Sequence, residues 1–342
     1  MGLMAARSIL FFALGNAQKA SSRVRIYWLL PELRALGYRC LVVEGNPRKH
    51  FWRFFYLILG HRDIVFQKSY SRYHLWLMRL ASLFNKRFWV DIDDAPSRGN
   101  NPVTEANFRK QLSLARGVFA GSEALVDLCR QWGGKAFYLP TSIVLENYRV
   151  DAKRAGPSIV LGWIGNGPHY SKDLLEILLP VLEDLSKRHS LSLHLVGTLG
   201  SEVLATQFGA VEKLDLHCID SLDWNRPEAM QEALAKFDIG LYPLLPDSFN
   251  QYKCGFKALE YQASGLPLVA SANRANAAIV EHGVSGFLAS SSEEWRQYLS
   301  ALIENPELRL RMGLAGRKRV EQSYSVETAA RRMSEIISDI QT

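Results

Sequence analysis

The chain contains 342 residues, of which 48% are hydrophobic and 22% are charged, so it can form a globular protein with two hydrophobic cores. Its net charge of +7 predicts an anionic partner, but the basic residues form no continuous stripe or motif typical of nucleic-acid binding. No apolar run approaches the roughly 20 residues that a membrane-spanning helix needs. The four cysteines show no CxxC or metal-like pairing, which predicts reduced packing residues in a cytoplasmic protein.

The N-terminal part of the chain predicts a strand, a loop and a helix. Residues 9–14 form an apolar run that is too short for the core of a signal peptide and is better explained as a first buried strand. A glycine-bearing loop follows, then a helix from about Ser21 that ends at Gly37, before a strand at 40–44. The loop meets its helix at the carboxyl edge of the sheet, where open α/β sheets bind ligands.

Ser22, Arg23 and Arg25 lie at this junction and are candidates for the acceptor side of a binding site. Arg23 and Arg25 point about 200° apart on a helix, so at most one of them faces a ligand. The alternative is a helix cap with solvated arginines.

Residues 48–62 (RKHFWRFFYLILGHR) predict a helix that is apolar on all sides except at Arg53 and has basic residues at both ends. Two interpretations remain open for this segment. It is a surface that docks on anionic lipid, or it packs in the N-terminal core with its arginines extended toward water.

A second basic and aromatic helix is predicted at 72–87, and here we favour packing in the core. The stripe expected to be buried consists of Tyr73, Trp76, Leu77, Leu80, Leu83 and Phe84. Leu75 and Met78 lie off that stripe.

Residues 63–68 and 88–94 each predict a strand that ends in polar side chains, and the second strand ends in the acidic sequence DIDD. Carboxylate oxygens are ligands that divalent metals prefer, so this pattern could suggest a metal site. Asp94 is also suited to cap the segment before Pro96.

The middle of the chain predicts the boundary between two domains. Ser122 is expected to cap a helix that follows a strand. The polar segment 151–157, which contains Gly and Pro, is the best linker in the chain. The pattern then restarts with a strand at 159–165, a loop at 166–171 and a helix at 172–188.

The segment from Lys253 to Ser271 predicts a turn, a helix, a break and a buried strand. The helix should begin near Gly255 and end at Gly265, because glycine suits the left-handed position that ends a helix. Pro267 prevents continuation, and residues 268–270 predict the next strand.

This helix carries an apolar stripe and a charged stripe. The apolar stripe, expected to face the core, consists of Phe256, Leu259 and Ala263. Lys253, Lys257 and Glu260 recur on the adjacent stripe. Cations for a diphosphate beside an acceptor for a diol are the chemistry that a nucleotide sugar requires. The alternative is a solvated face of lysines and a glutamate on an ordinary helix.

From Lys253 to Met333 the sequence resembles the C-terminal half of the retaining glycosyltransferases of family 4. The resemblance rests on Glu260, on GLPLVAS at 265–271 and on IVEHGVSGFL at 279–288. The helix NPELR…MG…GR at 305–317 and a later Tyr-Ser pair follow in the family's order. One departure is Tyr252, which stands where family members usually carry a first glutamate that touches the donor sugar.

The resemblance implies the GT-B fold, an α/β architecture of two facing Rossmann-like domains. Residues 1–152 would form the acceptor-side domain, joined by the C-terminal helix 326–342, which crosses back to it. Residues 153–325 would form the domain that binds the nucleotide sugar. The implied reaction transfers a sugar to a hydroxyl of a glycan or lipid-linked acceptor, with retention, in the synthesis of cell-surface polysaccharide or glycolipid.

The resemblance also implies roles for single residues. Glu260 would hold the nucleotide ribose, while Lys257 and Lys253 would bind the diphosphate. The remaining donor-side candidates are Gly165, Asn166 and Lys172, on the loop and helix after the strand at 159–165. Catalytic roles are expected for Lys257, whose charge acts on the leaving diphosphate, and for Asp93 and Asp94, which would meet the acceptor hydroxyl. No metal and no cofactor is expected.

Two other functions agree with the sequence. A non-catalytic relative that binds a glycan or nucleotide sugar would explain Tyr252, and a nucleotide-sugar epimerase would use the same fold. No carboxylate pair typical of glycoside hydrolysis stands out. For the enzyme we expect a cytoplasmic location with peripheral binding to anionic membrane through residues 48–62.

Overall fold

The computed structural model describes residues 7–45, 48–96, 102–150, 156, 158–223, 226–247 and 249–339. The chain divides into two compact units. The first contains Met1–Ser142, Tyr252–Cys254 and Ser325–Thr342, and the second contains Ile143–Gln251 and Gly255–Tyr324. The predicted linker at 151–157 lies almost wholly outside the described residues.

The first unit is built on a six-stranded parallel sheet with the order β2-β1-β3-β4-β5-β6. Its strands are β1 (Ser8–Phe12), β2 (Arg39–Val43), β3 (Asp63–Gln67), β4 (Arg87–Ile92), β5 (Gly117–Ala120) and β6 (Ala136–Tyr138). β1, β3 and β4 are buried along their whole length, as expected for a parallel sheet that is covered on both faces. The order reverses between β1 and β3, and such a reversal marks the place where open α/β sheets bind ligands.

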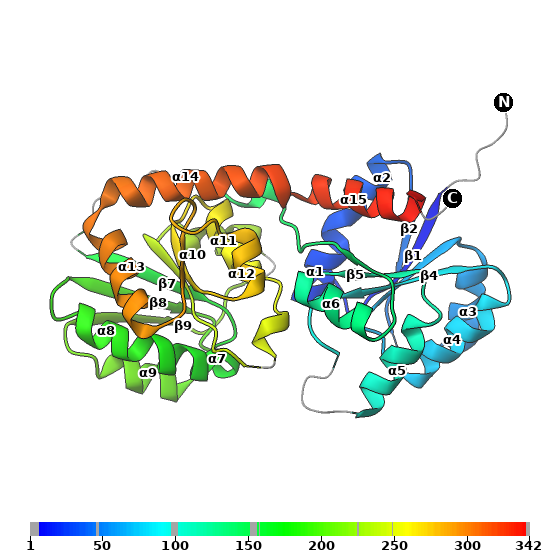
Figure 1. Ribbon diagram of the computed structural model, residues 1–342, viewed down its shortest axis with the longest axis horizontal. Coiled ribbons are helices and arrows are strands. Elements are labelled where there is room, and N and C mark those ends of the chain that lie inside the picture. The colour runs from blue at the N-terminus through cyan, green and yellow to red at the C-terminus, as the bar shows by residue number, and fades with distance from the viewer. Residues whose placement is uncertain are drawn as a thin grey trace. The chain divides into compact units, whose positions relative to one another are not determined.

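Helices cover both faces of this sheet (Figure 1). They are α1 (Ala20–Arg25), the 3₁₀ turn η1 (Tyr27–Leu29), α2 (Leu30–Ala35), α3 (Phe51–Leu59), α4 (Arg72–Ser82), α5 (Pro102–Leu112), α6 (Glu123–Gln131) and α15 (Val326–Asp339). The single helix predicted from Ser21 to Gly37 is wrong, because Pro31, near the start of α2, lacks the amide that a continuous helix would need. Ser122 caps α6 as predicted, since its side chain accepts from the Leu125 amide.

The last helix belongs to the first unit. α15 lies beside α2 (Figure 1), and Tyr38 Oη is 3.0 Å from Ser334 Oγ. The Arg332 guanidinium lies over the ring of Tyr138, 5.4 Å from its centroid. These contacts attach the C-terminal end of the chain to the first unit.

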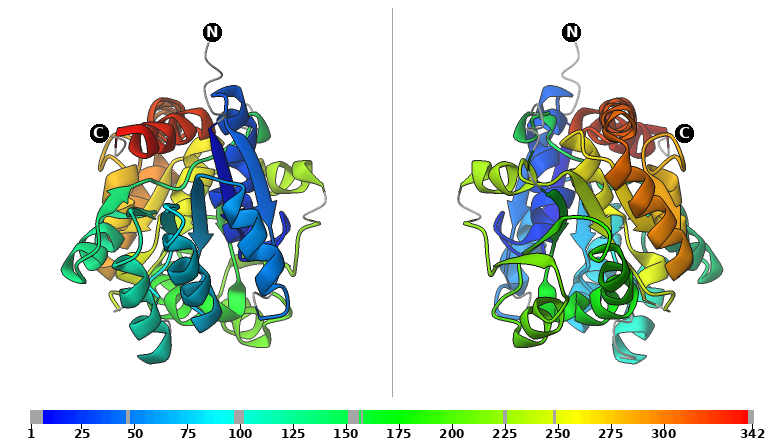
Figure 2. Two further views of the ribbon diagram at one scale, coloured as in Figure 1. Left: turned by 90° about the vertical axis from the view of Figure 1, so that its right-hand side faces the viewer. Right: turned by 90° about the vertical axis from the view of Figure 1, so that its left-hand side faces the viewer.

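α3 and α4 lie side by side over the face of the sheet that carries Leu10 and Phe66 (Figures 1 and 2). Phe54 and Ile58 of α3 are buried in that core, whereas Trp52 is 73% exposed and Tyr56 is 76% exposed. One side of the helix is therefore buried in the core, while the side that carries Trp52 and Tyr56 is exposed.

The stripe predicted to be buried on α4 is only partly confirmed, because Leu77 is buried but most of the other predicted members are not. Leu75 and Met78, which were placed off the stripe, are buried, whereas Trp76, Leu83 and Phe84 are 60%, 78% and 51% exposed. Both stripes are apolar, so the sequence pattern did not distinguish them. The orientation is decided by packing against the sheet and α3, which a helical period does not encode.

The second unit repeats the architecture with the order β12-β11-β10-β7-β8-β9. Its strands are β7 (Ile159–Ile164), β8 (Leu191–Val196), β9 (Leu214–Ile219), β10 (Ile239–Tyr242), β11 (Leu268–Ser271) and β12 (Phe287–Ala289). All pairings among these strands are parallel. The order reverses between β7 and β10.

The helices of the second unit follow its strands. They are η2 (Leu145–Asn147), α7 (Gly167–Asp173), η3 (Leu174–Leu178), α8 (Leu179–Leu185), α9 (Glu202–Gly209), α10 (Pro227–Leu234), α11 (Phe256–Ala263), α12 (Arg274–Ile279), α13 (Ser292–Glu304) and α14 (Pro306–Ser323). α14 packs closely on α11 (Figure 1). Gly313 permits this close packing, because a Cβ there would lie 2.0 Å from the carbonyl oxygen of Gly265, which follows α11. Gly265 has φ +67°, the left-handed conformation predicted for it.

Over the described ranges, we find no helix with the length and apolar character required to cross a bilayer.

Candidate functional site

The helix that carries Lys257 and Glu260 is buried rather than solvated. α11 contacts β10, β11, α12 and α14. Lys257 is only 9% exposed and Glu260 only 6%, which rules out the alternative of an exposed charged face. Gly255 precedes the helix with φ +68°, and a Cβ there would lie 2.3 Å from Ile279 Cδ1. The predicted start and end of this helix are confirmed to within two residues.

The Lys257 ammonium lies among three aromatic rings. Its Nζ atom is 3.9 Å from the ring centroid of Tyr170, 5.1 Å from that of Tyr242 and 5.5 Å from that of Trp163. Within the described part of the chain, no carboxylate lies within ion-pair distance of this ammonium. Aromatic faces offset only part of the desolvation of a buried cation, so the position favours an anionic ligand.

Gly165 brings Lys257 close to the switch point of the second sheet. A Cβ at Gly165 would lie 2.7 Å from Lys257 Cε and 2.7 Å from the Trp163 ring, so only glycine leaves the observed space. Gly165 directly follows β7, one of the two strands between which the strand order reverses. The structure therefore brings together Gly165 and Lys257, two of the residues predicted from the sequence for the donor side.

Glu260 is positioned by Tyr148, which the sequence analysis missed. Tyr148 Oη donates to Glu260 Oε1 at 3.2 Å. The Tyr148 carbonyl in turn accepts from Arg317 Nη1 at 2.8 Å. Because the carboxylate is buried and held by a hydroxyl, its direction is fixed before any ligand binds.

Asn166 and Lys172 have different surroundings. Asn166 caps α7, since its Oδ1 accepts from the His169 amide at 3.1 Å. Lys172 is 75% exposed in the last turn of α7, with its ammonium 3.8 Å from Glu176. The described contacts do not join Lys172 to Lys257 or Glu260, so Lys172 is a surface lysine rather than part of this cluster.

In the first unit, Gln67 ties the start of α1 to the edge of the sheet. Its Oε1 accepts from Ser22 Oγ at 2.9 Å and from the Leu14 amide at 3.0 Å, and its Nε2 donates to the Ser21 carbonyl at 2.9 Å. Ser22 is fully buried in this network, where it helps to position the loop. Arg23 is partly exposed and donates to the Gln18 carbonyl at 3.3 Å.

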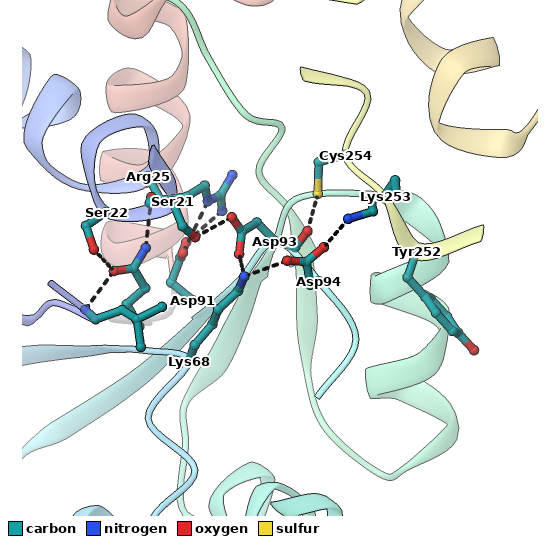
Figure 3. A network of polar contacts seen from close by, with 12 residues as sticks. Ser21, Ser22, Arg25, Lys68, Asp91, Asp93, Asp94, Tyr252, Lys253 and Cys254 are labelled. Atoms are coloured by element: carbon teal, nitrogen blue, oxygen red, sulfur yellow. Dashed lines mark hydrogen bonds and ion pairs between the residues drawn. The ribbon is translucent and has the colours of Figure 1, made fainter. Parts of the chain in front are cut away.

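Two carboxylates and two lysines form a network at the same edge (Figure 3). Lys68 pairs with Asp93 and lies 2.8 Å from Asp94, while Lys253 lies 3.3 Å from Asp94. Ser21 Oγ donates to Asp93 Oδ2 at 2.5 Å. Lys68 has φ +44°, a strained conformation for a residue with a side chain, and such strain gathers at functional sites.

These contacts keep the network charged. Burial acts to raise the pKa of Asp94, but Lys68 and Lys253 outweigh it and hold that pKa below its ordinary value. Burial acts to lower the pKa of Lys68, and Asp93 and Asp94 reverse this and raise it. The lysines therefore favour the ionised form of Asp94.

Arg25, expected on the acceptor side, is instead found buried in an ion pair. It is 2% exposed and forms a bidentate pair with Asp91 at 3.2 and 2.6 Å. Its Nη1 also donates to the Leu139 carbonyl at 2.7 Å. Burial raises the pKa of Asp91 while Arg25 opposes that rise.

Lys253 does not continue the charged stripe of α11, because the helix begins only at Phe256. It belongs to the first unit together with Tyr252 and Cys254. Cys254 Sγ lies 3.0 Å from the Asp93 carbonyl oxygen. Tyr252 ends the short helix η4 (Asn250–Tyr252), and its ring points away from the paired Lys253 and Asp94 (Figure 3).

No group of three or more His, Cys, Asp and Glu side chains in the described ranges is arranged to hold a metal ion. Asp93 and Asp94 are instead paired with lysines.

Several site residues escaped the sequence analysis, namely Gln67, Lys68, Tyr148, Trp163, Tyr170 and Tyr242. Gln67 and Lys68 carried a usable signal, because they are polar residues at the end of a strand next to the first one. The aromatic rings carried none, since aromatic residues in and after buried strands are ordinary core residues.

The chain folds into two Rossmann-like units, and Lys257 and Glu260 lie near the switch point of the second. Solved structures with the same arrangement of elements identify the fold class. Anabaena HepE in complex with UDP aligns with a TM-score of 0.73 and 15% identity, over 97% of this chain and 100% of that chain. Sucrose-phosphate synthase from Thermosynechococcus elongatus aligns with a TM-score of 0.75 and 14% identity, over 98% of this chain and 99% of that chain. The chain has the GT-B fold.

The family-model match lies almost entirely within the second unit. The family model for glycosyl transferases group 1 matches residues 158–305. D-inositol 3-phosphate glycosyltransferase of Streptomyces griseus is 32% identical over 133 residues, which are 38% of this chain and 26% of that protein. The match thus spans about a quarter of the length of that relative.

Proposed function

We propose that the chain is a glycosyltransferase that moves a sugar from a nucleotide sugar to a hydroxyl of a glycan or lipid-linked acceptor. The observation that carries the proposal is Lys257, a buried lysine whose ammonium has aromatic neighbours but no carboxylate partner in the described residues. It lies one helical turn from Glu260 and inside the segment that matches the glycosyltransferase family. An anion that also carries a diol fits both side chains.

On the donor side, Lys257 would bind the diphosphate and Glu260 the ribose hydroxyls. As the bond from the anomeric carbon to the diphosphate breaks, negative charge grows on the leaving group. A cation fixed at that position acts more strongly on the transition state than on the bound substrate. Structures of Anabaena HepE, which has the same fold, contain UDP or UDP-glucose, and this supports a nucleotide sugar as the donor.

On the acceptor side we assign Asp93 and Asp94. The Asp94 side chain is 29% exposed and that of Asp93 is 14% exposed. Asp94 would therefore accept a hydrogen bond from the acceptor hydroxyl, while Asp93 holds Lys68 and Ser21 in place. The sugar would gain its new bond from that hydroxyl oxygen with retention at the anomeric carbon. We propose that the reaction needs no metal and serves the synthesis of cell-surface polysaccharide or glycolipid.

The direct test is turnover of UDP-, GDP- and ADP-sugars, followed by release of the nucleoside diphosphate. We expect one base to be preferred and slow release even without an acceptor. Calorimetric titration of the matching nucleoside diphosphate should show binding that Lys257→Ala weakens. If the protein binds a nucleotide sugar but releases no nucleoside diphosphate from any donor, it is the non-catalytic binder that Tyr252 suggests. Conversion of the donor to an isomer would indicate the epimerase.

We also propose that the first unit binds anionic membrane through residues 48–62. Trp52 and Tyr56 of α3 are largely exposed, the exposed Trp76 lies on the adjacent α4, and the exposed Phe84 lies just after that helix. Phe84 contacts Phe55 of α3, with ring centroids 5.7 Å apart. Aromatic side chains with nearby cations are typical of protein surfaces that bind at the membrane interface.

A further inference from the structure

A cavity of about 370 Å³ lies in the first unit, at the edge of the sheet where the strands begin. Ser8, Arg39, Asp63 and Arg87 line it, and each is the first residue of its strand. The network of Asp93 and its partners follows the other ends of the parallel strands. The cavity is therefore separate from the candidate functional site.

The lining is strongly basic. Its arginines and lysine are Arg7, Arg39, Arg62, Lys86 and Arg87. Asp63 is the one carboxylate in this lining, and it already accepts from the Arg87 guanidinium and from Trp89 Nε1. Its charge is thus neutralised locally and leaves most of the cations uncompensated.

A structural role explains only part of this charge. Lys86 Nζ donates to the carbonyls of Leu59 and His61 at 2.6 and 2.9 Å, and so stabilises the C-terminal end of α3. Arg39 makes a weaker contact of this kind, at 3.4 Å from the Gly60 carbonyl oxygen.

Three other arginines have donors to spare. The Arg7 guanidinium has the Tyr38 ring as its neighbour, at 5.8 Å, and the Arg62 side chain makes no hydrogen bond or ion pair among the described residues. Arg87 Nε is buried without a hydrogen-bond partner. A buried unsatisfied donor of this kind is unfavourable unless a ligand or water accepts from it.

A second, larger cavity of about 600 Å³ shares Arg39, Gly60 and His61 with the first. Its other side is apolar and includes Leu41, Tyr56 and Leu57. We propose that the two cavities bind one phosphate-bearing ligand, with its phosphate among Arg7, Arg39 and Arg62 and an apolar part beside Leu41. Arginine suits this task because its planar donors match phosphate oxygens in pairs.

The test uses the full-length protein and inorganic phosphate at constant ionic strength, with chloride as the reference anion. Lys257→Ala serves as the background, so phosphate bound at the proposed donor site does not contribute. Arg39→Ala/Arg62→Ala is compared with Arg311→Ala/Lys318→Ala, which removes the same charge from exposed positions on α14. We expect saturable binding that is at least tenfold weaker in the first variant and unchanged in the second.

Equal phosphate affinity in the two double variants, or no saturable binding above the chloride reference, would overturn the proposal. Phosphatidylcholine vesicles with and without phosphatidic acid identify the source of the phosphate. Vesicle binding that requires phosphatidic acid and is lost in Arg39→Ala/Arg62→Ala points to a lipid. Phosphate binding without this vesicle effect points to a free phosphorylated molecule. Failure of the donor-site proposal would leave both results intact.

Discussion

Lys257 owes its chemical character to its neighbours. The rings of Trp163, Tyr170 and Tyr242 keep water away from the ammonium, and Gly165 leaves the space through which the side chain passes. Electrostatic attraction is stronger where water is excluded, so a diphosphate would gain more from this lysine than from an exposed one.

We expect Lys257→Ala and Glu260→Gln to have different kinetic effects. If Lys257 stabilises the charge that develops on the leaving diphosphate, its loss lowers kcat and kcat/KM together, by about a hundredfold or more. If Glu260 holds the ribose in both ground state and transition state, its loss chiefly raises KM for the donor. For Glu260→Gln, the expected loss of donor-binding free energy is about 1.5–3 kcal/mol, as for a hydrogen bond to a charged group.

Steady-state kinetics with the preferred donor and calorimetry of the nucleoside diphosphate measure these effects. Lys172→Ala is the matched control, because Lys172 is an exposed lysine of the same unit. Unchanged nucleotide affinity in both site variants would refute the assignment of Lys257 and Glu260.

We expect Gly165→Ala to weaken nucleoside diphosphate binding without removing any charge. The added methyl would lie 2.7 Å from Lys257 Cε and must displace that side chain or the Trp163 ring. The control is Gly209→Ala at the end of α9, where the nearest atom would be 3.9 Å away. The measurement is calorimetric titration of the nucleoside diphosphate into both variants. Equal affinities would show that displacement of Lys257 among its aromatic neighbours does not affect binding.

The sequence predicted some of these residues and not others, for physical reasons. Glu260 and Lys257 could be found because local spacing and a family motif mark them. Lys68 acts through an unusual backbone conformation, φ +44°, which nothing in its identity signals. Tyr148 meets Glu260 across 112 positions of sequence, and such a contact depends on the complete fold. Lys253 was misassigned because a helical spacing was extended beyond the start of its helix.

At the scale of elements, hydrophobic pattern predicted which segments are helices and strands better than it predicted their orientation. The buried strands and the helix ends at Gly37 and Gly265 follow from local sequence, and both glycines have positive φ. The exposed side of α4 does not follow from local sequence. The helix has two apolar stripes, and packing against the sheet and α3 decides which of them is buried. The division of the predicted first helix into α1, η1 and α2 was signalled by Pro31 and was missed.

α3 provides the prediction at this scale. We expect Trp52→Ser/Tyr56→Ser to reduce co-sedimentation with vesicles that contain anionic lipid. Both side chains are exposed, so their replacement should leave the hydrophobic core intact. Stability should change by no more than about 0.5 kcal/mol for each surface substitution. Binding of the wild type should weaken with added salt, since cations near the surface contribute about 1 kcal/mol each.

Leu310→Ser/Leu314→Ser is the control for this experiment, because it removes two exposed apolar side chains from α14. Equal vesicle binding by the two double variants, or wild-type binding that needs no anionic lipid, would contradict a membrane surface on α3.

At the scale of the whole molecule, each unit has its own switch point and its own kind of charge. The reversal between β7 and β10 lies near a lysine without a carboxylate partner among the described residues, whereas the reversal between β1 and β3 lies near carboxylates paired with lysines. This division matches a donor that is an anion and an acceptor that is a hydroxyl. It also determines what a metal ion could contribute.

We expect turnover to continue in EDTA, within about twofold of the untreated rate. On the donor side, Lys257 would supply the positive charge that a metal would otherwise bring to the diphosphate. On the acceptor side, a divalent ion at Asp94 would have to displace Lys68 and Lys253, which lie 2.8 and 3.3 Å from its carboxylate. The assay compares EDTA-treated enzyme with enzyme given Mg²⁺ or Mn²⁺. If EDTA abolishes transfer and only these ions restore it, Asp91, Asp93 and Asp94 become the candidate ligands, and Lys257 loses its role as the main cation of the reaction.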